Sequence, residues 1–276
     1  MKNSAIKKAC AVLSVVLGAS SVSTAVAVLL AAVVVFSAKG QESSQLITSY
    51  PFRESFERHY QMGPSPRIEI DMIAGPVVIS SGRAGMADVT VWRSAATRWE
   101  FDCYQVKIDP RPDLIRIATA RLTDRPECRD GLRDSQEIRL RVPPDALVDL
   151  SNIAGDLQIT GPVRGVKAKA IAGHASIAAA GTVDLQALAK GLSLRLGAAS
   201  PGTAIIQAVG GGLEIDVANR RNVEIRLDAN SLQNEVRVPP DFTRLMTRDG
   251  YLLKSGEGGP SLSLHAINGG VVVRRR

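Results

Sequence analysis

The residues of this chain that could perform catalysis are four carboxylates in short segments of alternating apolar and polar residues. Glu214 and Asp216 are two positions apart, which would place them on one face of a β-strand, and Asp156 and Asp184 fall in earlier segments of the same kind. Hydrolysis of a glycosidic bond uses two carboxyl groups about 5 to 9.5 Å apart, a spacing that neighbouring strands could supply. The alternative, which we favour, is that these carboxylates are solvated and discourage edge-to-edge pairing of strands. We therefore predict no enzyme activity and no catalytic residue, and we keep a polysaccharide-acting enzyme as the alternative.

Patterns for binding a metal or a nucleotide are missing from the sequence. His59, His174 and His265 are far apart and lack metal-ligand spacing. The run Gly210-Gly211-Gly212 follows a strand-like segment, but neither a helical pattern nor a lysine comes after it, so it predicts a turn. The sequence thus predicts no cofactor and no bound metal.

Two cysteines form an even pair in the main part of the chain. Cys10 falls in an apolar N-terminal segment, which leaves Cys103 and Cys128. A disulfide closing a loop of about 25 residues would stabilise the fold by about 3 kcal/mol in the chain-entropy model, provided the compartment is oxidising. The alternative is two unrelated thiols. We expect the disulfide.

Residues 1–38 predict a membrane-spanning helix. The segment from Ala9 to Ala38 has no charged residue, and about 20 apolar residues suffice to span a bilayer core. A cleaved signal peptide ending near Ala25-Val26-Ala27 is the alternative, but the apolar run continues beyond that site. Lysines precede the segment, so the positive-inside rule leaves the N-terminus in the cytoplasm. We predict a single-pass signal anchor in a bacterial cell membrane, with the C-terminal domain in the periplasm or at the cell surface.

The net positive charge does not point to nucleic acid. The chain has 34 basic and 27 acidic residues, a formal charge of +7. Seven basic residues at the two ends account for the excess, because removing them leaves 27 basic against 27 acidic residues. They are Lys2, Lys7, Lys8, Lys39, Arg274, Arg275 and Arg276. A balanced central domain predicts no nucleic-acid binding.

The remaining sequence predicts an all-β domain behind a linker. Residues 39–66 have mixed charge and end in Gly-Pro-Ser-Pro, which is typical of a polar linker. From residue 67 onward, apolar and polar residues alternate in short segments bounded by turn residues. With 24 glycines, 14 prolines and 4% aromatic residues, the composition favours many short strands joined by tight turns.

A short unit recurs along this domain: an apolar residue, a turn with glycine, then two apolar residues two positions apart. Gly155, Gly173 and Gly191 are 18 residues apart, which fits coil rungs of about 18 to 20 residues with two strands and two turns each. We predict β-solenoid (β-helix-like) repeats over residues 144–276 and a β-rich cap over residues 67–143; an antiparallel sandwich is the alternative. Glycine at the corners would permit positive φ and let the chain bend without a Cβ clash, and the expected turn glycines are Gly75, Gly155, Gly173, Gly191, Gly211 and Gly269.

Several short motifs, in order, resemble a known family. They are RIEI at residues 67–70, LRVPPD at residues 140–145 before the glycine units, and a glycine-rich segment at residues 256–271. This order resembles the bacterial "putative adhesin" family of β-strand-repeat domains, similar to auto-transporter adhesin heads. The resemblance covers residues 67–276 and implies an exported β-solenoid-like domain, with no catalytic residues to transfer.

These observations predict a membrane-anchored, extracytoplasmic β-repeat module for envelope or surface interaction. Its partners would be the membrane, through the N-terminal anchor, and an envelope glycan or protein. Two alternatives remain: the polysaccharide-acting enzyme, and an envelope stress sensor or scaffold.

Overall fold

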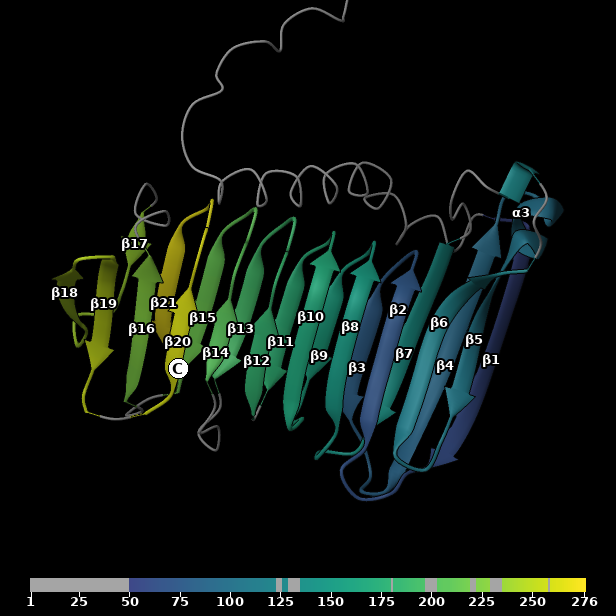
Figure 1. The fold of residues 1–276 in the computed structure, drawn as a ribbon, viewed down its shortest axis with the longest axis horizontal. Helices are drawn as coiled ribbons and strands as arrows, with labels where there is room; N and C mark the ends of the chain where they lie inside the picture. Colours follow the sequence, from purple (N-terminus) through teal and green to yellow (C-terminus); the bar gives the residue numbers. More distant parts are fainter. Residues whose placement is uncertain are drawn as a thin grey trace, which may run out of the picture.

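A computed structural model describes residues 50–276 except residues 123–125, 129–134, 180, 197–202, 219–221, 229–234 and 258. These residues form two large mixed sheets (Figure 1) and little helix, which confirms the prediction of an all-β domain. The short helices are α3 (Arg98–Cys103) and the 3-10 helix η1 (Pro126–Cys128).

The sheets have ten and eleven strands, and we call them sheet A and sheet B. In spatial order, sheet A contains β1 (Phe52–Gln61), β4 (Met86–Ala95), β7 (Ser135–Val142), β3 (Val77–Ser81), β9 (Leu157–Thr160), β11 (Ala175–Ala179), β13 (Leu192–Leu196), β15 (Leu213–Val217), β21 (Val271–Arg275) and β17 (Val236–Arg237). Sheet B contains β5 (Tyr104–Pro110), β6 (Leu114–Arg121), β2 (Arg67–Ile73), β8 (Leu147–Ile153), β10 (Gly165–Ile171), β12 (Thr182–Leu185), β14 (Ala204–Ile206), β20 (Ser261–Leu264), β16 (Val223–Asp228), β19 (Gly250–Ser255) and β18 (Thr243–Thr247).

Most of the domain is a stack of two-strand units, each with one strand in each sheet. Eight such units occur in the described chain, and neighbouring units pair in parallel through both of their strands. In spatial order they are β6 and β7, β2 and β3, β8 and β9, β10 and β11, β12 and β13, β14 and β15, β20 and β21, and β16 and β17. Because the pairing is in register, a residue of one unit lies beside the equivalent residue of the next.

The core lies between the sheets and follows from the alternation. Alternate residues of each strand point inward, and a row such as Ile70, Leu150 and Ala168 joins neighbouring strands of sheet B with at most 1% exposure. Each fully buried aliphatic side chain of this kind contributes about 1.5 to 3 kcal/mol. Intervening residues such as Asp149 and Lys167 point to solvent. The sheets therefore present rows of polar side chains on their outer faces.

Of the two reasons predicted for glycine at the corners, the structure supports the avoidance of a Cβ clash. A Cβ on Gly155 would lie 2.2 Å from the backbone of Gly75, and one on Gly173 would lie 2.4 Å from the carbonyl oxygen of Gly155. Positive φ was the wrong explanation, because the described glycines with positive φ are others: Gly85, Gly161, Gly250, Gly256 and Gly259. At five of the six predicted corners an added Cβ would lie within 2.8 Å of another segment of the chain, which is too close for a side chain, and at Gly191 the nearest atom is 3.1 Å away.

Positive φ at the corners belongs to residues other than glycine. Met72, Asn152, Ala170 and Ala266 have φ between 46° and 56°, and each immediately precedes a buried isoleucine. This left-handed conformation disfavours a residue with a Cβ. Its recurrence at equivalent positions shows that the corner geometry is a repeated feature of the fold.

Chain order and spatial order differ at both ends of the stack. The β6 and β7 unit lies outside the β2 and β3 unit, and the last unit in the chain, β20 and β21, inserts inside β16 and β17. Beyond the units, sheet A adds β4 and β1 at one end, where sheet B adds β5; at the other end sheet B adds β19 and β18 (Figure 1). We call these the β1 end and the β18 end.

The predicted linker is partly wrong, and the predicted membrane anchor lies outside the described residues. Residues 52–61 were assigned to a polar linker, but they form β1, which pairs with β4 over its whole length. No helix of the described residues is long and apolar enough to cross a bilayer. Residues 1–38, on which the predicted anchor falls, lie outside the described residues, so the anchor stays a prediction.

Candidate functional site

The four candidate carboxylates do not come together. Glu214 and Asp216 share the outer face of β15 in sheet A, but Asp184 lies on β12 in sheet B. Asp156 precedes β9, where its Oδ1 accepts a hydrogen bond of 2.8 Å from the backbone N–H of His174. The structure therefore leaves one pair, Glu214 and Asp216, for chemical consideration.

This pair lies in a group of charged residues on sheet A that we call the Asp216 cluster: Arg195, Glu214, Asp216, Arg274 and Arg276. Register places Arg195 of β13, Asp216 of β15 and Arg274 of β21 side by side on adjacent strands. Arg276 follows β21 directly. Sequence alternation at Leu213, Ile215 and Val217, all fully buried, turns Glu214 and Asp216 outward.

Ion pairs hold both carboxylates of the cluster. Arg276 Nε lies 2.9 Å from Asp216 Oδ2, and Arg274 donates to Glu214 Oε1 at 2.9 Å. Arg195 Nε lies 3.9 Å from Asp216 Oδ2, which is too far for a hydrogen bond. Both carboxylates are therefore engaged with arginines that lie on or directly after the neighbouring strand.

Exposure within the cluster is uneven. The Asp216 side chain is only 6% exposed, whereas those of Arg195, Arg274 and Arg276 are 52 to 58% exposed. Asp216 Oδ1 is buried and has no hydrogen-bond partner. The arrangement is a buried carboxylate beneath three guanidinium groups that reach solvent.

The histidines form no metal site. His59 Nδ1 lies 2.7 Å from Asp88 on the neighbouring strand, and this hydrogen bond raises the pKa of His59 above its ordinary value. His265 Nδ1 lies 3.3 Å from Asp228. Within the described ranges, no three His, Cys, Asp or Glu residues are grouped so that they could hold a metal ion.

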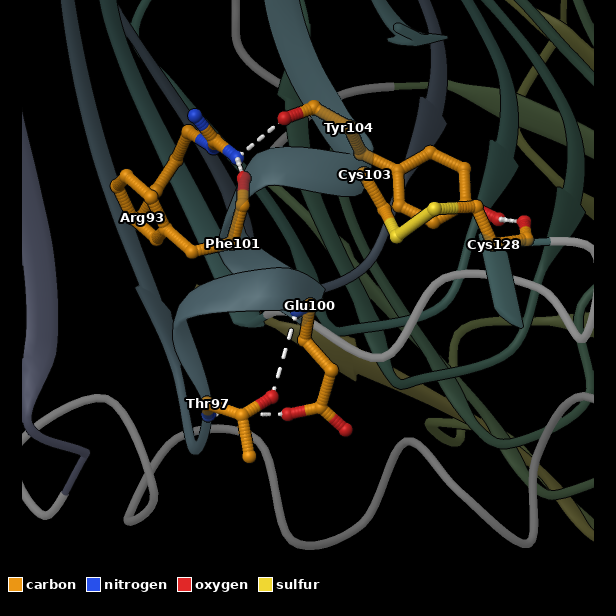
Figure 2. The surroundings of a disulfide bond; sticks show 7 residues. All are labelled: Arg93, Thr97, Glu100, Phe101, Cys103, Tyr104 and Cys128. Carbon is orange, nitrogen blue, oxygen red and sulfur yellow. Dashed lines mark hydrogen bonds between the residues drawn. A yellow bond between two sulfur atoms is a disulfide. The ribbon is translucent and has the colours of Figure 1, made fainter. Parts of the chain in front are cut away.

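The β1 end is closed by a disulfide and a buried arginine (Figure 2). Cys103 and Cys128 are bonded, and the Tyr104 hydroxyl donates to the Cys128 carbonyl oxygen at 2.5 Å. Arg93, which is 4% exposed, donates to the carbonyl oxygens of Phe101 and Tyr104 and to Glu54. Its guanidinium carbon lies 4.4 Å from the centre of the Phe101 ring. These contacts stabilise the fold, because each of these groups bonds to another part of the same domain.

Helix α3 begins with a capping box that fixes this end further. The Thr97 hydroxyl accepts from the Glu100 backbone N–H, and the Glu100 carboxylate accepts from the Thr97 backbone N–H (Figure 2). Such caps stabilise a helix start by about 1 kcal/mol. The cap orients α3 so that Cys103 at its end reaches Cys128.

The β18 end is closed by the middle arginine of the terminal three. Arg275 donates to Asp241 Oδ2 and to the Ser255 hydroxyl, and its guanidinium carbon lies 5.1 Å from the centre of the Phe242 ring. The hydrogen bond from Arg275 lowers the pKa of Asp241. Arg275 therefore serves the fold, whereas Arg274 and Arg276 on the other face belong to the Asp216 cluster.

No protein-family model matches the chain. No curated protein sequence matches it either. Solved structures align with most of it, among them a "putative cell adhesion protein" from Clostridium sporogenes (10% identity, 81% of this chain, 100% of that chain, TM-score 0.44), a "putative adhesin" from Bacteroides fragilis (10%, 82%, 99%, 0.27) and a "putative lipid binding protein" from Parabacteroides distasonis (10%, 81%, 97%, 0.24).

The names of the first two structures agree with the family resemblance seen in the sequence. At these identities and TM-scores, the alignments carry no argument about the ligand or activity of this chain.

Proposed function

We propose that this chain is a non-catalytic, extracytoplasmic β-solenoid that binds an envelope or surface partner through the outer face of sheet A. The observation that carries the proposal is the Asp216 cluster, in which strand register and the residue after β21 place five charged side chains on one face of sheet A. A rigid stack of paired strands holds such side chains in place before a ligand arrives, which lowers the entropic cost of binding.

A coil architecture underlies the proposal. Each unit places one strand in each sheet, and neighbouring units pair in parallel, as the rungs of a solenoid would. The stacked corner glycines supply a repeated turn. A solenoid offers a long, flat outer face, the shape suited to an extended partner.

The non-catalytic role is supported by how the carboxylates are used. Glu214 and Asp216 are both ion-paired with arginines, and Asp184 lies on the other sheet. A retaining or inverting glycosidase needs one carboxyl group protonated at the reaction centre. In the Asp216 cluster both carboxylates are instead bound to arginines of the fold.

The location outside the cytoplasm and the anchor are supported by the sequence and by the disulfide. Residues 9–38 carry no charge and follow three lysines. The Cys103–Cys128 disulfide fits an oxidising compartment. Both features suit a domain held outside the cytoplasm by its own N-terminus.

An array experiment tests this function. The full chain, solubilised in a nonionic detergent, is applied to immobilised bacterial envelope polysaccharides and envelope proteins, and bound glycans are analysed by mass spectrometry for cleavage. We expect saturable binding to a subset of the array without cleavage. Binding to nothing on the array, or cleavage that is lost in Asp216→Asn, would contradict the proposal.

A further inference from the structure

We infer that the Asp216 cluster binds the acidic groups of a polysaccharide, through Arg195, Arg274 and Arg276. This inference rests on the proposed function and names both the contact site and the class of ligand. The shared chemistry is an oxyanion on a sugar chain, either a carboxylate or a sulfate.

The guanidinium groups provide the donors for such a ligand. Each guanidinium carries five N–H donors in a fixed fork that matches an oxyanion. Arg276 uses Nε for Asp216, and Arg195 makes no contact with Asp216 within hydrogen-bond distance. More than half of each arginine side chain is exposed, so the remaining donors can reach a ligand.

Asp216 acts as a positioning residue for these arginines. Its carboxylate lies between Arg195 and Arg274 in the register row, where it offsets the repulsion between their charges. Arg195 and Arg274 lie two strands apart, about 10 Å at the usual strand spacing. That distance is the length scale of a disaccharide, so acidic groups that repeat along a polysaccharide could meet both arginines.

The surface beside the cluster suits a sugar chain. Register extends the row of Glu214 along sheet A through Ser193, Ser176 and Gln158. These neutral side chains can donate and accept hydrogen bonds, and Ser176 and Gln158 are exposed. A linear ligand anchored at the arginines would therefore find hydroxyl and amide partners on the next strands.

A lipid membrane fits the cluster less well. Binding in a membrane interface combines basic residues with exposed large apolar ones. The large apolar side chains with high exposure in this half of the stack are Ile205 (44%) on β14 and Leu245 (47%) and Met246 (79%) on β18, all in sheet B. The cluster itself lies on sheet A, and its apolar neighbour in register, Val272, is half-buried.

Binding measurements with defined probes test the inference. The detergent-solubilised full chain is titrated by calorimetry with polygalacturonate fragments, dextran sulfate fragments, neutral dextran and vesicles containing phosphatidylglycerol. We expect one or both acidic polymers to bind, neutral dextran not to bind, and affinity to fall with added salt. The two acidic arms distinguish a carboxylate from a sulfate.

Matched arginine variants locate the site. Arg195→Gln and Arg274→Gln should each weaken binding of the acidic polymer about tenfold, the scale of one hydrogen bond to a charged group. The controls are Arg116→Gln and Arg226→Gln, which remove equally exposed arginines paired with Glu69 and Glu224 on the outer face of sheet B. We expect the controls to change affinity less than twofold.

Several outcomes would overturn the inference. They are equal losses in the cluster and control variants, tighter binding to the vesicles than to either polymer with loss in the cluster variants, and no binding of either acidic polymer. If a ligand from the envelope array binds the cluster variants as tightly as the unchanged chain, only the site assignment is wrong and the proposed function stands.

Discussion

At each end of the stack, an arginine lies over a phenylalanine ring and pairs with a carboxylate. At the β1 end these residues are Arg93, Phe101 and Glu54, and at the β18 end they are Arg275, Phe242 and Asp241. Cation–ring stacking of this kind covers apolar side chains while keeping a charge near water. A stack of strands exposes a strand edge at each end, and both edges must be managed.

The two ends differ in how completely they are closed. The Arg93 side chain is 4% exposed and Arg275 is 17% exposed. The β1 end also has the disulfide and the ten residues of β1, whereas the β18 end finishes in two-residue β17 and in β18, whose five residues are all exposed. The comparison indicates a β1 end that stays closed and a β18 end that opens first.

The largest expected effect contrasts a stacked corner glycine near the β1 end with Gly270 near the β18 end, which is not stacked; the corner glycine beside it, Gly269, is stacked, with a Cβ 2.4 Å from the backbone of Gly211. A Cβ on Gly75 would lie 1.7 Å from the carbonyl oxygen of Gln136, whereas one on Gly270 would lie 3.3 Å from that of Glu235. Gly75→Ala must displace backbone, so we expect a loss of about 4 kcal/mol, above the usual cost of overpacking. Gly270→Ala should cost less than about 1 kcal/mol. Urea unfolding of the full chain measures both, and similar losses would contradict the difference in packing.

The arginines that close the two ends should show the next largest difference in stability. Arg93→Met leaves the carbonyl oxygens of Phe101 and Tyr104 without their donor in a buried site, and we expect a loss of about 3 kcal/mol. Arg275→Met removes a more exposed pair with Asp241, for which we expect about 1 kcal/mol. The same urea titration compares them. A larger loss for Arg275→Met would reverse the assignment of the more tightly closed end.

The disulfide gives a third contrast. Cys103→Ala combined with Cys128→Ala should lower the free energy of unfolding by about 2 to 3 kcal/mol. Hydrogen exchange resolved by peptide should speed up in α3 and β5, with little change in β18 and β19, because the bond joins segments of the β1 end alone. Reducing agent should reproduce the effect in the unchanged chain. Faster exchange spread evenly over both ends would show that the bond stabilises the whole stack.

The sequence predicted the parts of this fold that depend on local alternation. Leu213, Ile215 and Val217 set the buried face of β15, and the 18-residue spacing of Gly155 and Gly173 marks successive corners. The sequence pattern did not predict β1. This strand is at the edge of sheet A and extends past the end of sheet B, so it needs few apolar residues. Only every fourth residue of β1, starting with Phe52, is half-buried.

The Asp216 cluster could not be predicted as a set. Glu214 and Asp216 were singled out, and the terminal arginines were noted for charge. Arg274 is 60 residues from Glu214, and the two meet because β21 inserts between β15 and β17. Nothing local in the sequence encodes that insertion, since the chain first builds β16 and β17 and then returns.

The smallest contrast is in pH response, which should have opposite signs at the two ends. The hydrogen bond with Asp88 raises the pKa of His59 in the folded state, so its contribution at the β1 end is complete below the ordinary value of 6.5 and is lost as pH rises through the raised pKa. The hydrogen bond from Arg275 lowers the pKa of Asp241, so the contribution of Asp241 to stability at the β18 end is complete above the ordinary value of 3.8 and is lost as pH falls through the lowered pKa.

Hydrogen exchange, corrected for the intrinsic rate, should therefore quicken in β1 toward alkaline pH and in β18 and β19 toward acid. His59→Gln and Asp241→Asn should each abolish the response at its own end only, and loss of both responses in either variant would show that the ends are coupled through the stack.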